Sequence, residues 1–463
     1  MSQSVQTRDA REVAAAALGE VAQRMPRVGA VEPEVDGLGA ADRRLATAIV
    51  RCGVQRWLTL EAVLDAASGR RTAELEPMLR GVLTAGAAQL VFMDRLPSYA
   101  VVDRGVEASR RLVRPGAAKL TNAVLRKVAG LIAERRDQAS LNSSDAELPG
   151  GADRVSLLDG EVVMKMDVLP PATDRRAWLA AAWSVPRRLV DRWSERYGVD
   201  EAEALCRCAA RTPAVIVATG KGDDEGVAAE PGLSPHVERG FAVWSPSPEA
   251  DDPAVAASLT GVLARHPGWR VQDPTSARAV GLAAGLADSG QVHRVLDYCA
   301  GRGTKTHQLA AMFPGAEVVA TDTRDDRRRD LAEVFAASDR VTVCDPDAAM
   351  TGAYDLILLD VPCSNTGVLA RRPEARYRFS KQDLLELTKL QRTVLAAASA
   401  RLSDRGHVLY STCSVEAEEN DRMVQGFYDR SGFEVAAEHA TLPRGETAET
   451  YRDGGYAALL RRR

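Results

Sequence analysis

An apolar run and a glycine-rich turn stand together at residues 294–306, which read Arg294-Val295-Leu296-Asp297-Tyr298-Cys299-Ala300-Gly301-Arg302-Gly303-Thr304-Lys305-Thr306. A strand, a glycine turn and a helix in this order are typical of a cradle for a nucleotide-type cofactor. Glycines let a ligand approach the backbone, and a helix N-terminus offers free amides. The turn lacks the G-x-x-x-x-G-K-[ST] spacing of a phosphate-binding loop. It therefore favours a cofactor that places no phosphate at the glycines, such as S-adenosylmethionine.

The alternation of strands and helices continues beyond this turn. Strand-like runs occupy residues 294–297, 317–321, 340–344, 355–360 and 407–411, and helical stretches occupy 304–312, 325–337 and 383–402. This alternation predicts a parallel, doubly wound α/β sheet.

The second, third and fourth of these strands each end at an acid, namely Asp322, Asp345 and Asp360. In such sheets, ligands gather at the carboxyl ends of the strands, where Asp322 can accept hydrogen bonds from ribose hydroxyls and Asp345 can meet an adenine amino group. One strand-end acid alone is typical of a turn or a helix cap. The series of acids, together with the glycine turn, predicts a cofactor site.

Two cysteines follow two of the strands. Cys363 stands in Asp360-Val361-Pro362-Cys363-Ser364-Asn365-Thr366-Gly367, and Cys413 stands in Tyr410-Ser411-Thr412-Cys413-Ser414-Val415. A thiolate that adds to C6 of a pyrimidine makes C5 able to take a methyl group from a sulfonium, which splits one hard step into easier ones. Asp360 can assist the addition by holding or protonating the ring N3. The two thiols predict covalent chemistry at the strand ends.

We expect four segments along the chain. They are an all-α domain at 1–135, a linker or insertion at 136–172, a small mixed α/β subdomain at 173–270, and a Rossmann-like doubly wound domain at 271–463. Helical periodicity covers 8–25, 41–67, 74–93, 98–109 and 117–131 in the first segment. Runs at 138–144 and 148–151 have linker composition, and in the third segment we expect a loop at 221–235.

Bulk properties exclude several classes of protein. The net charge of −4 argues against a protein that coats nucleic acid by charge alone. No apolar run reaches about 18 residues and the first residues do not resemble a signal peptide, so we expect a cytoplasmic protein without a membrane partner. The seven cysteines are an odd number and lack zinc-ligand spacing, so neither a disulfide framework nor a metal site is expected.

The runs at 297–306, 355–369 and 410–420 resemble the motifs of the Sun/Fmu (RsmB-type) bacterial ribosomal RNA 5-methylcytosine methyltransferases, within the Nol/Nop/Sun family. The runs Asp42-Arg43-Arg44-Leu45 and Thr121-Asn122-Ala123-Val124-Leu125-Arg126 resemble the RNA-binding helical domain of the antitermination factor NusB, which is fused to the methyltransferase in this subfamily. The resemblance implies an all-α NusB-like domain followed by an α/β methyltransferase domain.

The resemblance also implies the roles of single residues. Cys413 is expected to attack C6, Cys363 to aid breakdown of the adduct, Asp360 to face the target base, and Lys305 to reach the active site. The residues expected to bind S-adenosylmethionine are Cys299, Ala300, Gly301, Arg302, Gly303, Thr304, Lys305, Asp322, Asp345 and Asp360.

The chain departs from the family pattern Cys-Ala-Ala-Pro-Gly-Gly-Lys-Thr in the cofactor turn. Gly301 and Arg302 replace Ala-Pro, and Thr304 replaces a glycine. Asn365 stands where the family often has glycine, and we expect the turn to survive because asparagine tolerates a positive φ. We expect the site to be competent.

The expected substrate is a cytosine in small-subunit (16S) ribosomal RNA, naked or at an early stage of assembly, and the expected state is a monomer. Three alternatives stay open: a methyltransferase acting on transfer RNA, a noncatalytic RNA-binding or antitermination-type protein, and a DNA cytosine methyltransferase. The last is disfavoured by the presence of Cys413. The basic run at 371–378 is expected to contact phosphates and stack a base, whereas Arg327, Arg328 and Arg329 are expected to be solvated.

Overall fold

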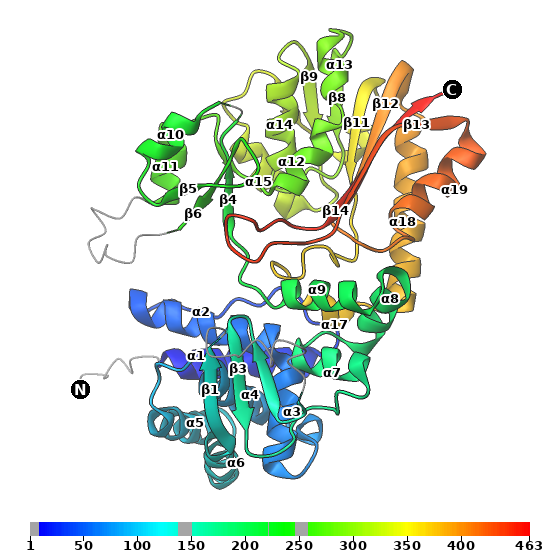
Figure 1. The fold of residues 1–463 in the computed structure, drawn as a ribbon. Coiled ribbons are helices and arrows are strands. Elements are labelled where there is room, and N and C mark those ends of the chain that lie inside the picture. Colours follow the sequence, from blue (N-terminus) through cyan, green and yellow to red (C-terminus); the bar gives the residue numbers. More distant parts are fainter. Residues whose placement is uncertain (1–8, 138–150, 221, 246–257) are drawn as a thin grey trace. The chain divides into compact units, whose positions relative to one another are not determined.

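The computed structural model describes residues 9–137, 151–220, 222–245 and 258–463 (Figure 1). The chain divides into two compact units. We call the first the helical unit; it comprises Met1–Arg211 and Leu369–Phe379. We call the second the sheet unit; it comprises Thr212–Val368 and Ser380–Arg463.

Six α-helices open the helical unit, where the apolar periodicity predicted five helical stretches. They are α1 (Ala10–Arg24), α2 (Ala40–Gln55), α3 (Trp57–Ser68), α4 (Pro77–Phe92), α5 (Ser98–Leu112) and α6 (Ala117–Leu131), with a 3₁₀ turn, η1, at Thr72–Glu74. The Asp9 side chain caps α1 by accepting a hydrogen bond from the Arg11 amide at 2.7 Å. The stretch expected as one helix at 41–67 is two helices, because the chain leaves helical geometry at Arg56.

A three-stranded antiparallel sheet follows; its first strand lies mostly in the range expected to be all-α, and the other two lie in the range expected as linker. Its strands are β1 (Ile132–Asp137), β2 (Arg154–Leu157) and β3 (Gly160–Met164), in the order β1-β3-β2. Residues 138–150, which include most of the two runs of linker composition, lie outside the described residues. The described remainder forms strands because Val155 and Val162 bury one face of the hairpin completely.

Three further helices and one distant segment complete the helical unit. The helices are α7 (Arg175–Ala182), α8 (Arg187–Tyr197) and α9 (Val199–Ala209), and the segment contains α17 (Ala375–Arg378). We expected a boundary between 172 and 173, but the units divide between Arg211 and Thr212. The reason is contact at the end of α2 and start of α3: Gln55 donates to the Ala209 carbonyl at 3.2 Å, and Thr59 donates to the Ala181 carbonyl at 2.6 Å.

The sheet unit begins with a small four-stranded sheet in the order β5-β6-β4-β7. Its elements are β4 (Val215–Ala218), α10 (Asp224–Ala229), β5 (Leu233–Pro235), β6 (Phe241–Trp244), α11 (Leu259–Arg265) and β7 (Arg270–Val271). The expectation of a loop at 221–235 was wrong for the described residues, 222–235, because they include a helix and a short strand. Asp223 caps α10 and Val227 fills the small core, so a helix forms despite the glycines around it.

The main sheet has seven strands in the order β10-β9-β8-β11-β12-β14-β13. They are β8 (Arg294–Asp297), β9 (Glu317–Ala320), β10 (Val341–Val343), β11 (Tyr354–Asp360), β12 (Leu402–Thr412), β13 (Phe433–Thr441) and β14 (Gly455–Arg462). The first five are parallel, which confirms the predicted doubly wound sheet, and β14 runs antiparallel to both of its neighbours. The sequence analysis did not foresee β13 and β14.

Helices cover both faces of this sheet. They are α12 (Pro274–Gly281), α13 (Ala284–Asp288), α14 (Thr304–Met312), α15 (Asp325–Val334), α16 (Pro346–Ala349), α18 (Lys381–Ser399) and α19 (Asp421–Ser431). Alternate strand residues enter two different cores: Leu356 and Leu358 pack with α12, α14 and α15, whereas Ile357 and Leu359 pack with α16, α18 and α19. Both faces of β11 are therefore buried, as in a doubly wound fold. None of the described helices is long and apolar enough to cross a membrane.

Candidate active site

The carboxyl ends of the parallel strands gather the expected site residues at one edge of the main sheet. Leu358 of β11 pairs with Asp297 of β8, and Asp360 pairs with Ser411 of β12. The segments that leave β8, β11 and β12 therefore start side by side. Figure 1 shows β8, β11 and β12 as neighbouring strands, in agreement with the strand order β8-β11-β12.

The two predicted cysteines meet at this edge. The Sγ atoms of Cys363 and Cys413 are 3.0 Å apart, within contact distance. The Cys413 thiol also donates to Oδ1 of Asn365 at 3.3 Å, and the Asn365 amide donates to the Cys363 carbonyl at 2.8 Å. Asn365 has a φ of 61°, so the turn adopts the left-handed conformation that its asparagine was expected to tolerate.

The environment holds Cys363 in its thiol form. The hydrogen bond to Cys413, burial and the charge of the Cys413 thiolate together raise the pKa of Cys363 well above its ordinary value. Two thiols this close do not both ionise easily, because the second negative charge forms beside the first. The arrangement suits one thiolate at a time.

Lys305 supplies the positive charge next to the thiols. Its Nζ atom lies 2.7 Å from Oδ2 of Asp360, while Oδ1 of Asp360 accepts a hydrogen bond from the Ser411 hydroxyl at 3.2 Å. Burial acts to lower the pKa of Lys305, but the charge and hydrogen bond of Asp360 and the charge of Cys413 outweigh it and raise that pKa. Lys305 thus remains an ammonium ion that can stabilise a thiolate.

A buried polar network that the sequence analysis missed supports the Cys363 loop. The Glu419 carboxylate accepts hydrogen bonds from the Ser364 amide at 2.9 Å, from the Ser364 hydroxyl and from the Gln391 amide at 2.9 Å. Gln391 also donates to the Pro362 carbonyl at 2.9 Å. Glu419 lies in the 410–420 run, so its motif could have marked it as a site residue. Its hydrogen-bond partners could not be predicted, because they stand 28 and 55 residues away.

The glycine turn forms a cradle between β8 and β9. Gly301 and Gly303 have φ values of 57° and 80°, and a Cβ atom on Gly303 would lie 2.6 Å from the Phe335 ring. Asp322 accepts from the Gly301 amide at 3.1 Å and from the Arg324 amide at 2.9 Å, which fixes its carboxylate beside the turn. Ala300 donates to the Thr321 carbonyl at 2.9 Å, so the turn is tied to the end of the next strand.

Asp297, at the end of β8, is a second residue that the sequence analysis did not single out. It is fully buried, Thr306 donates to its Oδ2 at 2.7 Å, and its Oδ1 has no partner. Burial raises its pKa to about 7. A buried acceptor without a partner beside a glycine cradle fits a site built for a polar ligand. The donor and acceptor set of the turn fits a nucleoside-type cofactor.

The remaining expected cofactor residues differ in exposure. Cys299 is half-buried and burial raises its pKa, Arg302 is exposed, and Thr304 is the first residue of α14. Asp345 is exposed and lies 3.1 Å from Nη2 of Arg328.

The expectation that Arg328 is solvated was wrong. Its side chain is only 19% exposed, because its Nη1 donates to the Asp322 carbonyl at 2.9 Å while its Nη2 reaches Asp345. Arg328 therefore connects the ends of β9 and β10. Its neighbour Arg327 is more exposed and lies 3.6 Å from the Asp322 carboxylate.

The expectation for the basic run was wrong at Arg376 and Tyr377. Arg376 and Tyr377 are 0% and 3% exposed, so neither can contact a phosphate or stack on a base. Both belong to the helical unit, where Arg376 donates to backbone carbonyls and Tyr377 donates to the Val54 carbonyl at 2.7 Å. Long-range contacts of this kind leave no local trace in the sequence.

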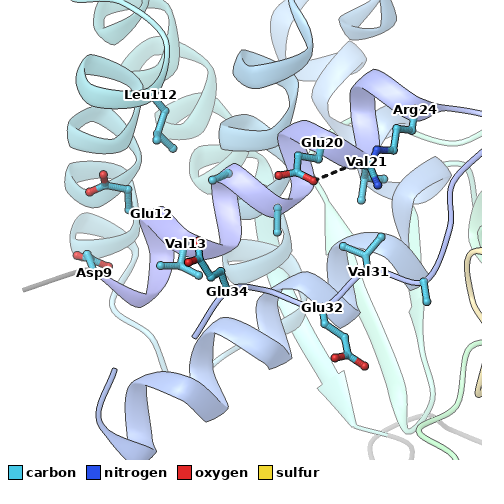
Figure 2. A pocket seen from close by; sticks show the side chains of 13 residues that line it. Asp9, Glu12, Val13, Glu20, Val21, Arg24, Val31, Glu32, Glu34 and Leu112 are labelled. Carbon is cyan, nitrogen blue, oxygen red and sulfur yellow. Dashed lines mark ion pairs between the residues drawn. The ribbon is translucent and has the colours of Figure 1, made fainter. Parts of the chain in front are cut away.

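A cavity of about 460 Å³ lies in the helical unit, and none of its lining residues belongs to the candidate site. Figure 2 shows its lining from α1, the segment after α1 and Leu112 of α5. Five of its lining residues are acidic and one, Arg24, is basic. An acidic lining repels phosphate, so this cavity is not suited to hold an RNA backbone.

Comparison with known proteins agrees with the geometry. Residues 286–450 match the family described as 16S rRNA methyltransferase RsmB/F, and residues 8–130 match the NusB family. A putative methyltransferase of Mycobacterium tuberculosis is 30% identical over 397 residues, which cover 82% of this chain and 77% of the relative. The ribosomal RNA small subunit methyltransferase B of Salmonella agona is 28% identical and covers 98% of each chain.

A solved structure shares the fold over nearly the whole chain. The crystal structure of PH0851 superposes with a TM-score of 0.67 at 18% identity, and the match covers 99% of this chain and all of the other. The NusB match lies in the helical unit, and the RsmB/F match lies in the sheet unit except for Leu369–Phe379, which belongs to the helical unit. The chain belongs to the 16S rRNA methyltransferase RsmB/F family and is an S-adenosylmethionine-dependent RNA methyltransferase.

Proposed function

We propose that this protein methylates C5 of a cytosine in small-subunit ribosomal RNA through a covalent bond between Cys413 and C6. The observation that carries the proposal is the contact of the two thiols at 3.0 Å with the Lys305–Asp360 ion pair at the same strand ends. The names of the relatives, which specify the small-subunit ribosomal RNA, support the substrate class.

Cys413 forms the first bond. Its thiolate, stabilised by the Lys305 ammonium, adds to C6 of the cytosine, and the electron pair of the C5–C6 bond moves toward N3. The Lys305–Asp360 pair lies where it can hold or supply the proton that N3 takes up. The glycine turn and Asp322 would hold S-adenosylmethionine, which would supply the methyl group to C5 and leave as S-adenosylhomocysteine.

Cys363 acts in the second half of the reaction. Once Cys413 is bound to carbon it carries no negative charge and no thiol, so two of the causes that raise the pKa of Cys363 disappear. Cys363 then ionises more easily, giving its proton to solvent, and can take the proton from C5 while N3 returns its proton to the Lys305–Asp360 pair. The C5–C6 double bond re-forms, the C6–sulfur bond breaks, and Cys413 leaves as a thiolate. The target base must be unstacked for this geometry, because sulfur attacks the face of the ring.

The test uses three variants incubated with total RNA and S-adenosylmethionine and separated on a denaturing gel. Cys363→Ala should accumulate a protein–RNA adduct, Cys413→Ser should form none and lose turnover, and Cys52→Ala should behave as wild type. Cys52 is a suitable control because it lies in the helical unit and burial raises its pKa to about 12. Sequencing the trapped RNA identifies the cytosine.

Two outcomes would contradict the proposal. Full turnover by Cys413→Ser would exclude Cys413 as the nucleophile. An adduct formed mainly with transfer RNA would retain the chemistry and replace the substrate class.

A further inference from the structure

Asn365 contacts both cysteines of the candidate active site. The Cys413 thiol donates to its Oδ1 atom at 3.3 Å, and its Nδ2 atom donates to the Cys363 carbonyl at 2.8 Å. The Sγ atoms of the two cysteines are 3.0 Å apart. All three residues belong to the sheet unit. Asn365 therefore closes a ring of contacts that runs through both cysteines.

The contact with Cys363 fixes the direction of the Asn365 amide group. A backbone carbonyl can only accept a hydrogen bond, so the amide must present its NH2 group to Cys363. The oxygen and nitrogen of an asparagine side chain are assigned from such contacts, and here one assignment satisfies them. Oδ1 therefore faces Cys413, which meets an acceptor rather than a donor.

An acceptor beside a sulfur favours the thiol over the thiolate. The Cys413 thiol has a proton to donate to Oδ1, whereas its thiolate would place a negative charge against the negative end of the amide dipole. Lys305 acts in the opposite direction, because its ammonium ion stabilises the thiolate. The proposed nucleophile thus lies between one group that favours its reactive form and one that favours its unreactive form.

The backbone at residue 365 limits which side chains can stand there. Its φ of 61° lies in the left-handed region, which glycine, asparagine and aspartate adopt more readily than other residues. The glycine that is frequent here in the family motif would complete the turn but would offer no acceptor to Cys413. The asparagine of this chain therefore adds an interaction that the turn itself does not require.

We propose that Asn365 is a positioning residue that holds the proton on the Cys413 thiol and thereby limits the amount of thiolate in the enzyme without RNA. Cys413 is half-buried, so small electrophiles in solvent can reach it. The retained proton protects it, because the thiolate is the reactive form of a cysteine. The consequence for methyl transfer rests on the proposed function, in which Cys413 attacks C6. The effect on the thiol itself does not.

The first experiment measures the rate at which iodoacetamide alkylates Cys413 in the full-length protein without RNA, resolved by peptide mass spectrometry. The rate is recorded between about pH 6 and pH 10, because ionisation moves this profile along the pH axis whereas access scales all of its values. The variants are Asn365→Gly and Asn365→Asp. Both new residues tolerate the positive φ, and both lack the NH2 group that donates to Cys363, so a loosened turn would affect them alike.

The two variants should move the profile in opposite directions. Asn365→Gly removes the acceptor, so the profile should move to lower pH, and the rate at about pH 7 relative to the rate at high pH should rise about fivefold. Asn365→Asp places a negative charge beside the sulfur, so the profile should move to higher pH and the same ratio should fall about tenfold. Circular dichroism over the same pH range verifies that both variants are folded.

Two controls separate this effect from a general one. Cys344 is also half-buried, and it follows β10, which β9 and β8 separate from β11, so its alkylation should be the same in every variant. Gln291→Glu adds the same charge on an exposed residue before β8, at the opposite edge of the main sheet, and should leave the Cys413 profile unchanged. Cys413 profiles that move in the same direction in both Asn365 variants, or that stay at the wild-type position in either, would overturn the role of Asn365.

The second experiment measures single-turnover methyl transfer to total RNA. Asn365→Asp should be about tenfold slower than the wild type at about pH 7 and should recover as pH rises, because the thiolate returns. Gln291→Glu should match the wild type. A loss in Asn365→Asp that persists at high pH would contradict the proton-holding role. Opposite shifts in alkylation with undiminished methyl transfer in Asn365→Asp would instead retain that role and refute Cys413 as the nucleophile.

Discussion

Two clusters in this molecule form where backbone elements end, and they use those ends in opposite ways. In the sheet unit, the carboxyl ends of β8, β11 and β12 bring together the thiols of Cys363 and Cys413 and the Lys305–Asp360 pair. In the helical unit, the carboxyl ends of three helices surround Arg376, and its hydrogen bonds go to their carbonyls and to that of Leu369.

The difference concerns which groups are left free to react. Strand ends in a parallel sheet are satisfied by the ladder up to the last residue, so the side chains that follow are available for chemistry. Helix ends leave carbonyls without partners, so a side chain placed there is consumed in satisfying them. We therefore expect changes in the strand-end cluster to affect activity, and changes in the helix-end cluster to affect the stability of the helical unit.

The largest effect is expected from Lys305→Met. The variant keeps a long side chain of similar volume but removes the charge that pairs with Asp360 and stabilises the Cys413 thiolate. Turnover should fall about a thousandfold, a loss typical of removing a group that stabilises charge in the reaction. The measurement is single-turnover methyl transfer to RNA.

The thermal midpoint of Lys305→Met should stay close to that of the wild type, because the proposed role is in chemistry. A large drop in stability with little loss of turnover would place Lys305 among the structural residues and remove the distinction between the two clusters.

The second largest effect is expected from Arg376→Met. Its apolar side chain leaves the carbonyls at the ends of α2 and α9 without their donor, and each buried group left unsatisfied costs about 1–3 kcal/mol. The free energy of unfolding of the helical unit should fall by about 3 kcal/mol. Urea unfolding followed by circular dichroism measures the change.

Arg372→Met is the control for this prediction. Arg372 is exposed in the same basic run, so its replacement should change stability by less than about 0.5 kcal/mol. If both variants lost the same free energy of unfolding, the stability of the helical unit would not depend on the guanidinium of Arg376 in particular.

The contrast also explains what the sequence could predict. The five parallel strands, the helices between them and the meeting of Cys363 with Cys413 follow from local patterns, because each residue is placed by the strand just before it. Even the conformation of Asn365 could be anticipated from its residue type. The cluster around Arg376 could not be predicted from the sequence, because the hydrogen-bond partners of Arg376 stand 7 to 321 residues away and no local sequence pattern links them to it. The same argument covers Glu419, which needs Ser364 and Gln391, and the antiparallel strands β13 and β14.

A third effect concerns Asp297, whose pKa burial raises to about 7 from an ordinary value of 3.8. Because the folded state binds this proton more tightly than the unfolded state, the stability that the group contributes is present at low pH and is lost as pH rises toward and through 7. Asp297→Asn should remove this dependence while still accepting a hydrogen bond from Thr306.

The measurement is the difference in the free energy of unfolding between Asp297→Asn and wild type. Between about pH 6 and pH 8 it should shift by about 1.4 kcal/mol in favour of the variant. Other groups that titrate in this range cancel in the difference. A difference that is constant with pH would show that Asp297 is ionised throughout, so that its unpartnered oxygen carries a charge.

The smallest effect is expected from Ser411→Ala. This variant removes the hydrogen bond from Ser411 to the Asp360 carboxylate and leaves the one from Lys305. Ser411 donates to Oδ1 at 3.2 Å, a longer contact than the 2.7 Å between Lys305 and Oδ2. A neutral donor at that distance contributes about 1 kcal/mol, so kcat should fall only about fivefold. If Ser411→Ala instead lost as much activity as Lys305→Met, the orientation of Asp360 rather than the charge of Lys305 would control the reaction. The strand-end cluster would then depend, like the cluster around Arg376, on the exact placement of a side chain by its hydrogen bonds.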